Sequence, residues 1–121
     1  MALIFPVRFK GNDMIKYVFP TKQKDVDMII KYANNHSYIQ KIVIFGSAVT
    51  WKCDVNSDLD IAVCFADLNE ENYSKFFKFL TRSLSSQFDL IDYRLNDNKY
   101  LKNDIDTKGV VVYDRIDQAR A

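Results

Sequence analysis

Two aspartates one position apart, Asp58 and Asp60, are the residues of this chain whose types and spacing best suit catalysis. They lie at the start of an apolar run, and ten residues separate Asp58 from Gly46-Ser47, which ends an earlier apolar run. Side chains alternate along a strand, so the two carboxylates face the same side of a sheet, roughly 6.5–7 Å apart at Cα. Two such charges repel each other unless a cation lies between them. The spacing therefore predicts a divalent metal site.

Mg²⁺ suits this pair, because it commonly takes one or two carboxylates together with phosphate oxygens of a substrate. Two such ions about 3.5–4 Å apart stabilise the attacking and leaving oxygens of an in-line displacement. A third carboxylate would complete the site, and the next predicted strand offers Asp89 and Asp92 on opposite faces. The residues alone leave that choice open. The alternative for Asp58 is a structural role in a turn.

Gly46-Ser47 is suited to holding phosphate. A glycine lets the backbone approach a ligand closely, and amides at a helix start bind phosphate oxygens. The Ser47 hydroxyl adds a donor. Taken alone, however, the dipeptide is more often an ordinary turn.

Composition limits the class of protein. A chain of 121 residues is about one domain, with 48% apolar and 27% charged residues. The net charge of +1 argues against dedicated duplex nucleic-acid binding. No apolar run approaches the roughly 18–20 residues of a membrane span. The two cysteines, Cys53 and Cys64, form neither a metal cluster nor a disulfide framework, so a reducing, cytoplasmic location is expected.

Apolar periodicity predicts alternating helices and strands, which favours a small α/β or α+β domain built on one sheet. Helices are expected at about Thr21–Asn35 with Thr21 as the cap, at Asn69–Ser85 with Asn69 as the cap, and at Lys99–Thr107. Strands are expected at Lys41–Phe45, Leu59–Phe65, Phe88–Leu95 and Val110–Tyr113, with Leu3–Phe9 as a further strand or extended arm and Gln118–Ala121 as a frayed tail.

Two helix faces have expected roles. The basic residues Lys22, Lys24 and Lys31 are expected to form a solvated face of the first helix. The second helix carries an apolar stripe that is expected to be core. Its members are Tyr73, Phe76, Phe77, Leu80 and Leu84.

In combination, these residues resemble the nucleotidyltransferase superfamily of DNA polymerase β, and specifically its minimal branch. The signature of that family is an apolar residue before Gly-Ser, a short gap, an acid–apolar–acid–apolar run and a third acid on a later strand. The matching residues here are Phe45-Gly46-Ser47 and Asp58-Leu59-Asp60-Ile61. Asp89 matches the third acid best. The resemblance spans roughly Asp25–Asp114.

The resemblance implies an α+β, two-layer nucleotidyltransferase fold. Its mixed central sheet would have helices mainly on one face and the active site on the other. The whole chain, 1–121, would form one such domain with its core at about 22–114. The implied activity is transfer of a nucleoside monophosphate, AMP from ATP, to a hydroxyl, with release of pyrophosphate. Asp58 and Asp60 would hold two Mg²⁺ ions, and Asp89, a third metal and catalytic residue, would help to activate the acceptor. Gly46 and Ser47 would hold the triphosphate.

One segment departs from the family pattern. Many minimal members continue Gly-Ser with Ala-Arg-Gly, whose arginine contacts phosphate, whereas this chain has Ala48-Val49-Thr50-Trp51. Lys52 is expected to replace that arginine, with Ser57 as a further phosphate contact, and Arg82 or Arg94 are alternatives. Trp51 is expected to pack against protein, the alternative being stacking on a base or on a partner side chain.

The resemblance also implies a partner. Minimal members are often paired with a small helical HEPN protein in toxin–antitoxin systems, where the transferase adds AMP to a tyrosine of the toxin. A HEPN-like partner is therefore expected, or else self-association that completes the acceptor site. The alternative function is a binding module that neutralises its partner by contact, with weak or no catalysis. A single-strand RNA binder is a third reading, which the balanced charge and the carboxylates disfavour.

Overall fold

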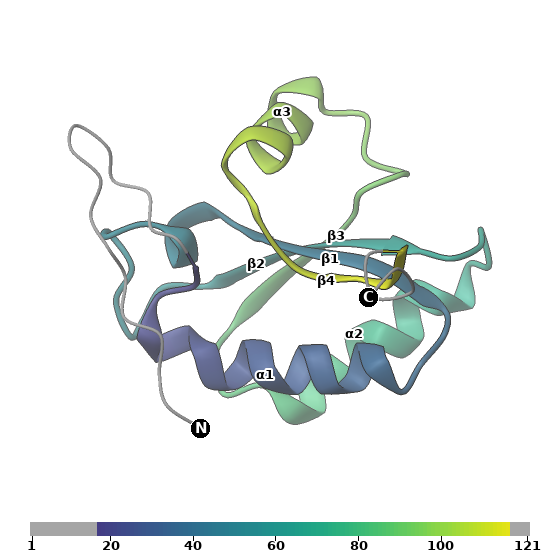
Figure 1. Cartoon of the computed structure of the whole chain (residues 1–121), viewed down its shortest axis with the longest axis horizontal. Helices are drawn as coiled ribbons and strands as arrows, with labels where there is room; N and C mark the ends of the chain where they lie inside the picture. The colour runs from purple at the N-terminus through teal and green to yellow at the C-terminus, as the bar shows by residue number, and fades with distance from the viewer. Residues whose placement is uncertain (1–16, 117–121) are drawn as a thin grey trace.

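The computed structural model describes residues 17–116, and its elements alternate as the sequence predicts (Figure 1). The third strand ends at Asp92 instead of the predicted Leu95. The expected strand or arm Leu3–Phe9 and the expected frayed tail Gln118–Ala121 lie outside the described residues. The elements are α1 (Pro20–Asn34), β1 (Ile39–Phe45), the short 3-10 helix η1 (Gly46–Val49), β2 (Leu59–Phe65), α2 (Glu71–Ser83), β3 (Phe88–Asp92), α3 (Lys99–Lys108) and β4 (Val110–Asp114).

The helix starts are set by different local signals. The predicted cap Thr21 is wrong, because α1 begins with Pro20 and no side chain caps its first turn. Proline suits this position, since its fixed φ is helical and it lacks an amide N–H that would go unpaired. The predicted cap Asn69 is one residue too early, because Glu70 occupies the cap position of α2, although the Asn69 side-chain oxygen accepts a hydrogen bond from the Glu71 amide at 2.9 Å.

The four strands form one mixed sheet in the order β3-β2-β1-β4. β1 is antiparallel to β2 and β4, whereas β2 and β3 are parallel and are joined by the crossover helix α2. Phe45 lies opposite Asp60 in the first pairing, and Asp60 lies opposite Asp89 in the parallel one. The register therefore lines up the end of β1, the start of β2 and the start of β3.

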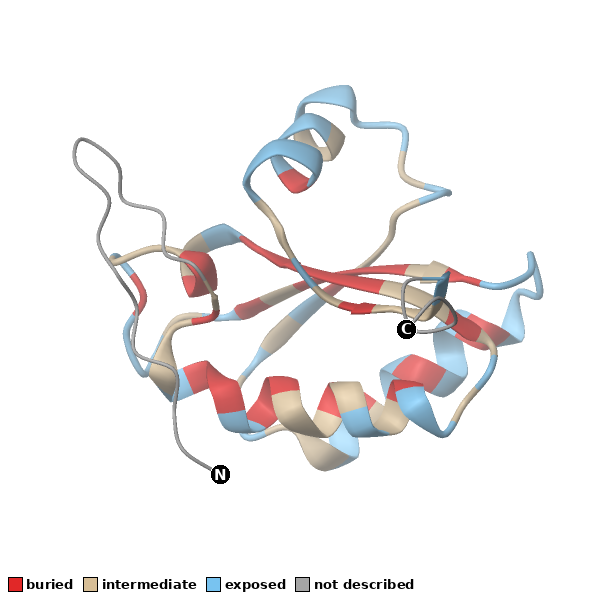
Figure 2. Ribbon diagram, viewed as in Figure 1, coloured by how far each residue is buried: buried red, intermediate tan, exposed pale blue. Residues whose placement is uncertain are grey.

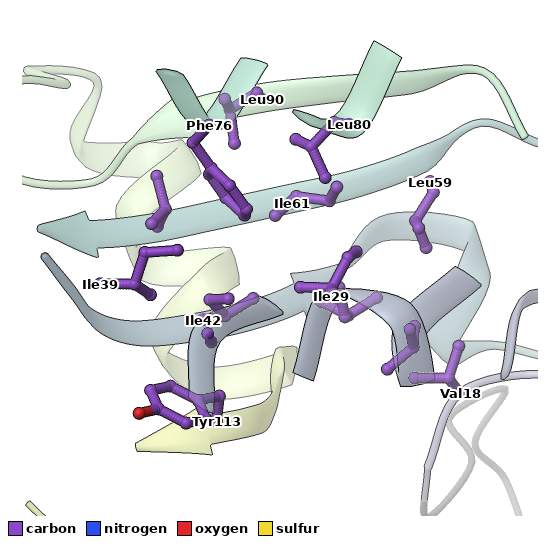
Figure 3. Close-up of a cluster of buried hydrophobic side chains, with 14 of the residues drawn as sticks. Val18, Ile29, Ile39, Ile42, Leu59, Ile61, Phe76, Leu80, Leu90 and Tyr113 are labelled. Carbon is purple, nitrogen blue, oxygen red and sulfur yellow. The ribbon is translucent and has the colours of Figure 1, made fainter. Parts of the chain in front are cut away.

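Helices α1 and α2 cover one face of the sheet, and α3 lies over part of the other face (Figure 1). Figure 2 shows buried residues on the sides of α1 and α2 that face the sheet, while α3 is mostly exposed. The main core lies between the sheet and the first two helices, and Figure 3 shows its side chains. A smaller cluster packs under α3 and consists of Val43, Phe45, Ala62 and Ile105. Helices mainly on one face of a mixed sheet confirm the predicted fold class. None of the helices within residues 17–116 has the length and apolar character to cross a membrane.

Lys22 corrects the expectation of a solvated lysine face. Lys24 and Lys31 are exposed, but Lys22 is 1% exposed, and its Nζ donates to Ser86 Oγ at 3.1 Å. One turn further along α1, the buried Asp25 carboxylate accepts from the Ser85 and Ser86 amides at 3.0 and 2.9 Å. Buried charges need such partners. This network fixes the loop from α2 into β3, so it sets where β3 begins.

The apolar stripe of α2 divides into two parts. Phe76 and Leu80 are fully buried in the main core, as predicted. Tyr73 and Phe77 are 36% and 44% exposed, so the expectation that they belong to the core is wrong. Their rings stack at 6.2 Å, and Phe77 meets Phe88 at 5.3 Å between centroids. They therefore project beside the outer strand β3 instead of under the sheet.

We expect Asp25→Asn to lower the free energy of unfolding by about 2–3 kcal/mol at pH 7, because the amide that replaces this buried carboxylate cannot accept all the hydrogen bonds that Ser85 and Ser86 donate. Burial alone would raise the pKa of Asp25, but the hydrogen bonds from Ser85 and Ser86 outweigh it and hold the pKa below the ordinary 3.8. The stabilisation is therefore fully present above about pH 4 and is lost as the pH falls further.

Urea denaturation at pH 7 and pH 3 measures this effect. The difference between wild type and Asp25→Asn should shrink at pH 3. The control is Asp97→Asn at an exposed position before α3, which should change stability by less than about 0.5 kcal/mol. An equal loss for Asp25→Asn at both pH values would contradict this account.

Candidate active site

Asp60 and Asp89 meet on the face of the sheet that carries α3. They are direct partners in the parallel pairing of β2 and β3. The alternate residues Leu59, Ile61 and Leu90 are buried in the core under α1 and α2, which turns both acids to the opposite face. The predicted alternation of β2 is thus confirmed.

The two carboxyl groups are electrostatically coupled. The pKa of Asp60 is raised to about 6, first by burial, then by the charge of Asp89 and a hydrogen bond with it, and last by the charge of Asp58. A carboxyl group with this pKa holds a proton, or attracts a cation, close to neutral pH. Asp60 is therefore the electrostatic centre of the group.

Asp58 and Asp92 stand outside this pair. Asp58 is exposed, immediately before β2, and contributes the smallest of the charge effects on Asp60. Asp92 lies on the other face of β3, and its Oδ1 accepts from the Arg94 amide at 3.2 Å. Of the two acids, Asp89 is therefore the one that lies beside Asp60. Within residues 17–116, no three His, Cys, Asp or Glu side chains are arranged to hold a metal ion together.

The chemistry of this pair fits a divalent cation that is shared with a substrate. The charge of Asp89 helps to raise the pKa of the facing Asp60, and a cation between the two carboxylates would offset this repulsion. Mg²⁺ commonly uses one or two carboxylates and completes its shell with water and phosphate oxygens. Asp60 and Asp89 provide that number of carboxylates, and Asp58 is near enough to affect the charge of Asp60.

Gly46 packs directly against Asp60. Its φ is +73°, in the left-handed region, and a Cβ at this position would lie 2.1 Å from Asp60 Oδ2. Only glycine fits both the conformation and the contact. The chain then forms η1, which is anchored by a 2.8 Å hydrogen bond from the Phe19 amide to the Ala48 carbonyl. The Gly-Ser backbone is therefore fixed beside the acids.

The remaining predicted phosphate contacts lie in the loop before β2. Ser57 Oγ accepts from the Asp54 amide at 3.0 Å, so its hydroxyl takes part in a turn of that loop. Lys52 is exposed on the same loop. Trp51 packs edge-on against Phe19, with 6.1 Å between ring centroids, in agreement with the expected packing role.

The two alternative arginines lie elsewhere. Arg94 Nη2 donates to the Phe65 carbonyl at 2.7 Å, at the opposite end of β2 from Asp60. Arg82 is exposed in the last turn of α2, on the opposite side of the sheet from the acid pair. Neither arginine is brought to the acid pair.

An open hollow of about 500 Å³ borders Asp60 and Asp89. Its other walls are apolar side chains from β1, β3, α2 and α3, among them Phe45, Tyr73, Phe77, Phe88 and Leu101. The apolar stripe of α2 predicts a core position for Tyr73 and Phe77, and no sequence motif marks Leu101. One sequence signal could have identified this wall: the apolar stripe of α2 holds more aromatic residues than can all pack against the core.

Three solved structures similar to this chain come from toxin–antitoxin complexes. One, of MntA–HepT, is 28% identical with a TM-score of 0.57 and covers 81% of this chain and 77% of that chain. A second contains a tri-AMPylated HEPN toxin of Shewanella oneidensis with its MNT antitoxin; it is 29% identical, with a TM-score of 0.58 and coverage of 82% and 77%. A third, a toxin–antitoxin structure with AMP-PNP, is 30% identical, with a TM-score of 0.61 and coverage of 78% and 77%.

Comparison with curated proteins finds no match. The family model described as "Polymerase beta, Nucleotidyltransferase" matches residues 27–118, a range that includes Gly46, Asp60 and Asp89. The order of these residues along the chain, their register across three strands and the mixed sheet agree with that match. The chain therefore belongs to the polymerase β nucleotidyltransferase family.

Proposed function

We propose that this protein, acting as one nucleotidyltransferase domain, transfers AMP from ATP to a hydroxyl group of a partner protein. The observation that carries the proposal is the contact of Asp60 with both Asp89 and the Gly46 backbone. These three residues bring a metal-binding carboxylate, a candidate base and a phosphate-binding backbone to one place. Positioning and charge neutralisation are most of what phosphoryl transfer needs.

Each residue has a role in this reaction. Gly46 and the Ser47 hydroxyl hold the triphosphate, with Lys52 and Ser57 on the neighbouring loop as further phosphate contacts. Asp60 with Asp89, and Asp60 with Asp58, are the carboxylate pairs that would hold the two Mg²⁺ ions, which when bound neutralise phosphate charge.

Asp89 also orients the acceptor hydroxyl and takes its proton. The acceptor oxygen forms a bond to the α-phosphorus, the bond from that phosphorus to the bridging oxygen breaks, and pyrophosphate leaves.

The partner is proposed to be a HEPN-like protein, and the acceptor one of its tyrosines. The support is similarity: the MNT antitoxin of Shewanella oneidensis, 29% identical, is in complex with a tri-AMPylated HEPN toxin, and another relative is a toxin–antitoxin structure with AMP-PNP. The competing candidate is neutralisation of the partner by contact alone. It is favoured by Trp51, which packs on Phe19 in the segment where many minimal members carry an arginine.

We expect Asp60→Asn and Asp89→Asn each to reduce AMP transfer by at least about 100-fold, because each removes a carboxylate of the coupled pair. The assay combines the purified chain with Mg²⁺, labelled ATP and the protein encoded by the adjacent gene. Asp97→Asn, an exposed acid in the loop before α3, is the matched control and should retain full activity.

Wild type that transfers no label, or an Asp60→Asn variant that transfers it normally, would refute the catalytic proposal. If Asp60→Asn still neutralises its partner in cells, neutralisation by contact becomes the better account.

Mg²⁺ is expected to stabilise the protein in a pH-dependent way. Without metal, native Asp60, with a pKa of about 6 against the ordinary 3.8, binds its proton more tightly than the unfolded chain does. Its contribution to stability therefore falls as the pH rises between these values. Since Mg²⁺ binds the ionised pair, the rise in Tm caused by Mg²⁺ should be small at pH 5, increase through pH 6 and level off above pH 7.

Thermal denaturation with and without Mg²⁺ tests this expectation. In Asp60→Asn the Mg²⁺ effect should be weak and should not change through pH 6. A wild-type Tm increase of the same size at pH 5 and pH 7 would show that Asp60 is not the group that binds the ion.

Gly46→Ala is expected to abolish transfer while the chain still folds. The new methyl group would lie only 2.1 Å from Asp60 Oδ2 and displace it, and the φ of +73° adds strain of about 1–2 kcal/mol. Gly109→Ala is a steric control away from the acids, since its Cβ would lie 2.4 Å from the Ile105 carbonyl oxygen and 2.5 Å from Val43 Cγ1.

Both variants should lose stability in urea denaturation, but only Gly46→Ala should lose transfer beyond its unfolded fraction. Equal activity of the two folded variants would contradict a specific role for the contact of Gly46 with Asp60.

A further inference from the structure

An exposed apolar surface runs along the outer edge of β3, beginning at the acid pair. Phe77 and Tyr73 form its middle, and the Phe88 ring lies against Phe77 next to Asp89. Leu68 and Leu95, both exposed, continue it from the loops after β2 and β3. These five residues are called the edge surface below. Contiguous exposed apolar side chains of this kind mark interaction sites.

Tyr73 joins two hollows into one continuous surface. It lines both the 500 Å³ hollow that contains Asp60 and Asp89 and a second hollow of about 260 Å³ that contains Leu68 and Leu95. Its hydroxyl donates to the Leu90 carbonyl of β3 at 2.8 Å, and its ring stacks on Phe77. The side chains are thus held in place before any partner arrives, which lowers the entropy cost of binding.

The order of the strands indicates from which side the acceptor approaches in the proposed reaction. Gly46 follows β1, Asp60 lies on β2 and Asp89 lies on the outer strand β3. In an in-line displacement the attacking oxygen and the leaving oxygen are on opposite sides of the phosphorus. With the triphosphate held at Gly46, the acceptor comes from the β3 side. The edge surface is what lies on that side.

The size and charge of the surface indicate what kind of acceptor it fits. The five residues of β3 extend over about 16 Å, longer than a nucleobase or a single side chain. Most of the charged residues that line the two hollows are acidic. Their negative charge would repel a nucleic-acid backbone. These residues are Asp60, Asp67, Glu70, Asp89 and Asp92, against Arg94. A polypeptide with apolar and basic side chains is complementary to both features.

We propose that the edge surface is the docking site of the acceptor polypeptide, which covers Phe77 and Tyr73 with apolar side chains and presents its hydroxyl to Asp89. The inference rests on the proposed transferase function and adds where the acceptor binds and what chemistry recognises it. Phe77 is a specificity-determining residue in this arrangement, because it is exposed, borders the acids and makes no hydrogen bond that the fold needs.

The test is Phe77→Ser, compared with wild type in initial rates of AMP transfer to the protein encoded by the adjacent gene. The acceptor and ATP are varied separately. The KM for the acceptor should rise about tenfold or more, as for loss of a central aromatic contact, while the KM for ATP stays within about twofold. The matched control is Tyr100→Ser on α3, which removes an aromatic ring that is 89% exposed. It should leave both KM values unchanged, and thermal denaturation should show that both variants are folded.

Each outcome decides the inference. An unchanged acceptor KM in Phe77→Ser overturns it, and a raised ATP KM in place of the acceptor KM would assign the surface to the nucleotide. If wild type transfers nothing, the transferase proposal has failed, and calorimetric binding of the same protein decides the docking site separately. A Kd that Phe77→Ser raises about tenfold then supports the edge surface as the docking site. An equal Kd for the two proteins, or no binding by wild type, overturns that assignment.

Discussion

The contact between the Gly46 backbone and the Asp60 carboxylate is the constraint on which the rest of the site depends. Phe45 and Asp60 are paired across β1 and β2, so the chain that leaves β1 has to turn directly beside that carboxylate. A Cβ at position 46 would clash with Asp60 Oδ2 at 2.1 Å. The left-handed turn at Gly46 both makes room for the acid and directs the backbone of η1 past it. In the proposed reaction, the position of the triphosphate would therefore be set by the acid that would bind the metal.

This arrangement costs stability, and the other face of the sheet offsets it. A half-buried carboxyl group beside a second one is unfavourable without a cation, as the raised pKa of Asp60 indicates. The residues on either side of Asp60, Leu59 and Ile61, are fully buried between the sheet and helices α1 and α2. Burial of one such aliphatic side chain contributes about 1.5–3 kcal/mol. The core on one face of β2 thus fixes the strand, and this allows the other face to carry an electrostatically unfavourable acid.

The parts of this fold that the sequence predicts are those set by local pattern. The apolar runs and the alternation from Asp58 to Phe65 predict β1, β2 and the face of Asp60, because strand geometry alone determines which side chains share a face. The choice of Asp89 over Asp92 needed the family resemblance, since it depends on the register between two strands. The burial of Lys22 was not predictable, because its partner Ser86 is 64 residues away in the chain. The exposure of Phe77 was not predictable for a related reason. Phe77 follows the buried Phe76 by about 100° around the helix, so both fit an apolar stripe. Only the position of β3 shows which of the two side chains faces inward.

The site is closed on one side and open on the other, and this asymmetry follows from the strand order. On the β1 side, η1 is tied to Phe19, Trp51 packs on the same residue, and Ala48 and Val49 are buried. That side suits a small, charged substrate held by fixed backbone groups. On the other side Asp89 is exposed on the outer strand β3, and partly exposed aromatic rings replace further protein layers. A second substrate that approaches there has to bring its own surface to cover those rings. Because a macromolecular acceptor does so and a small alcohol does not, the topology itself favours a protein acceptor.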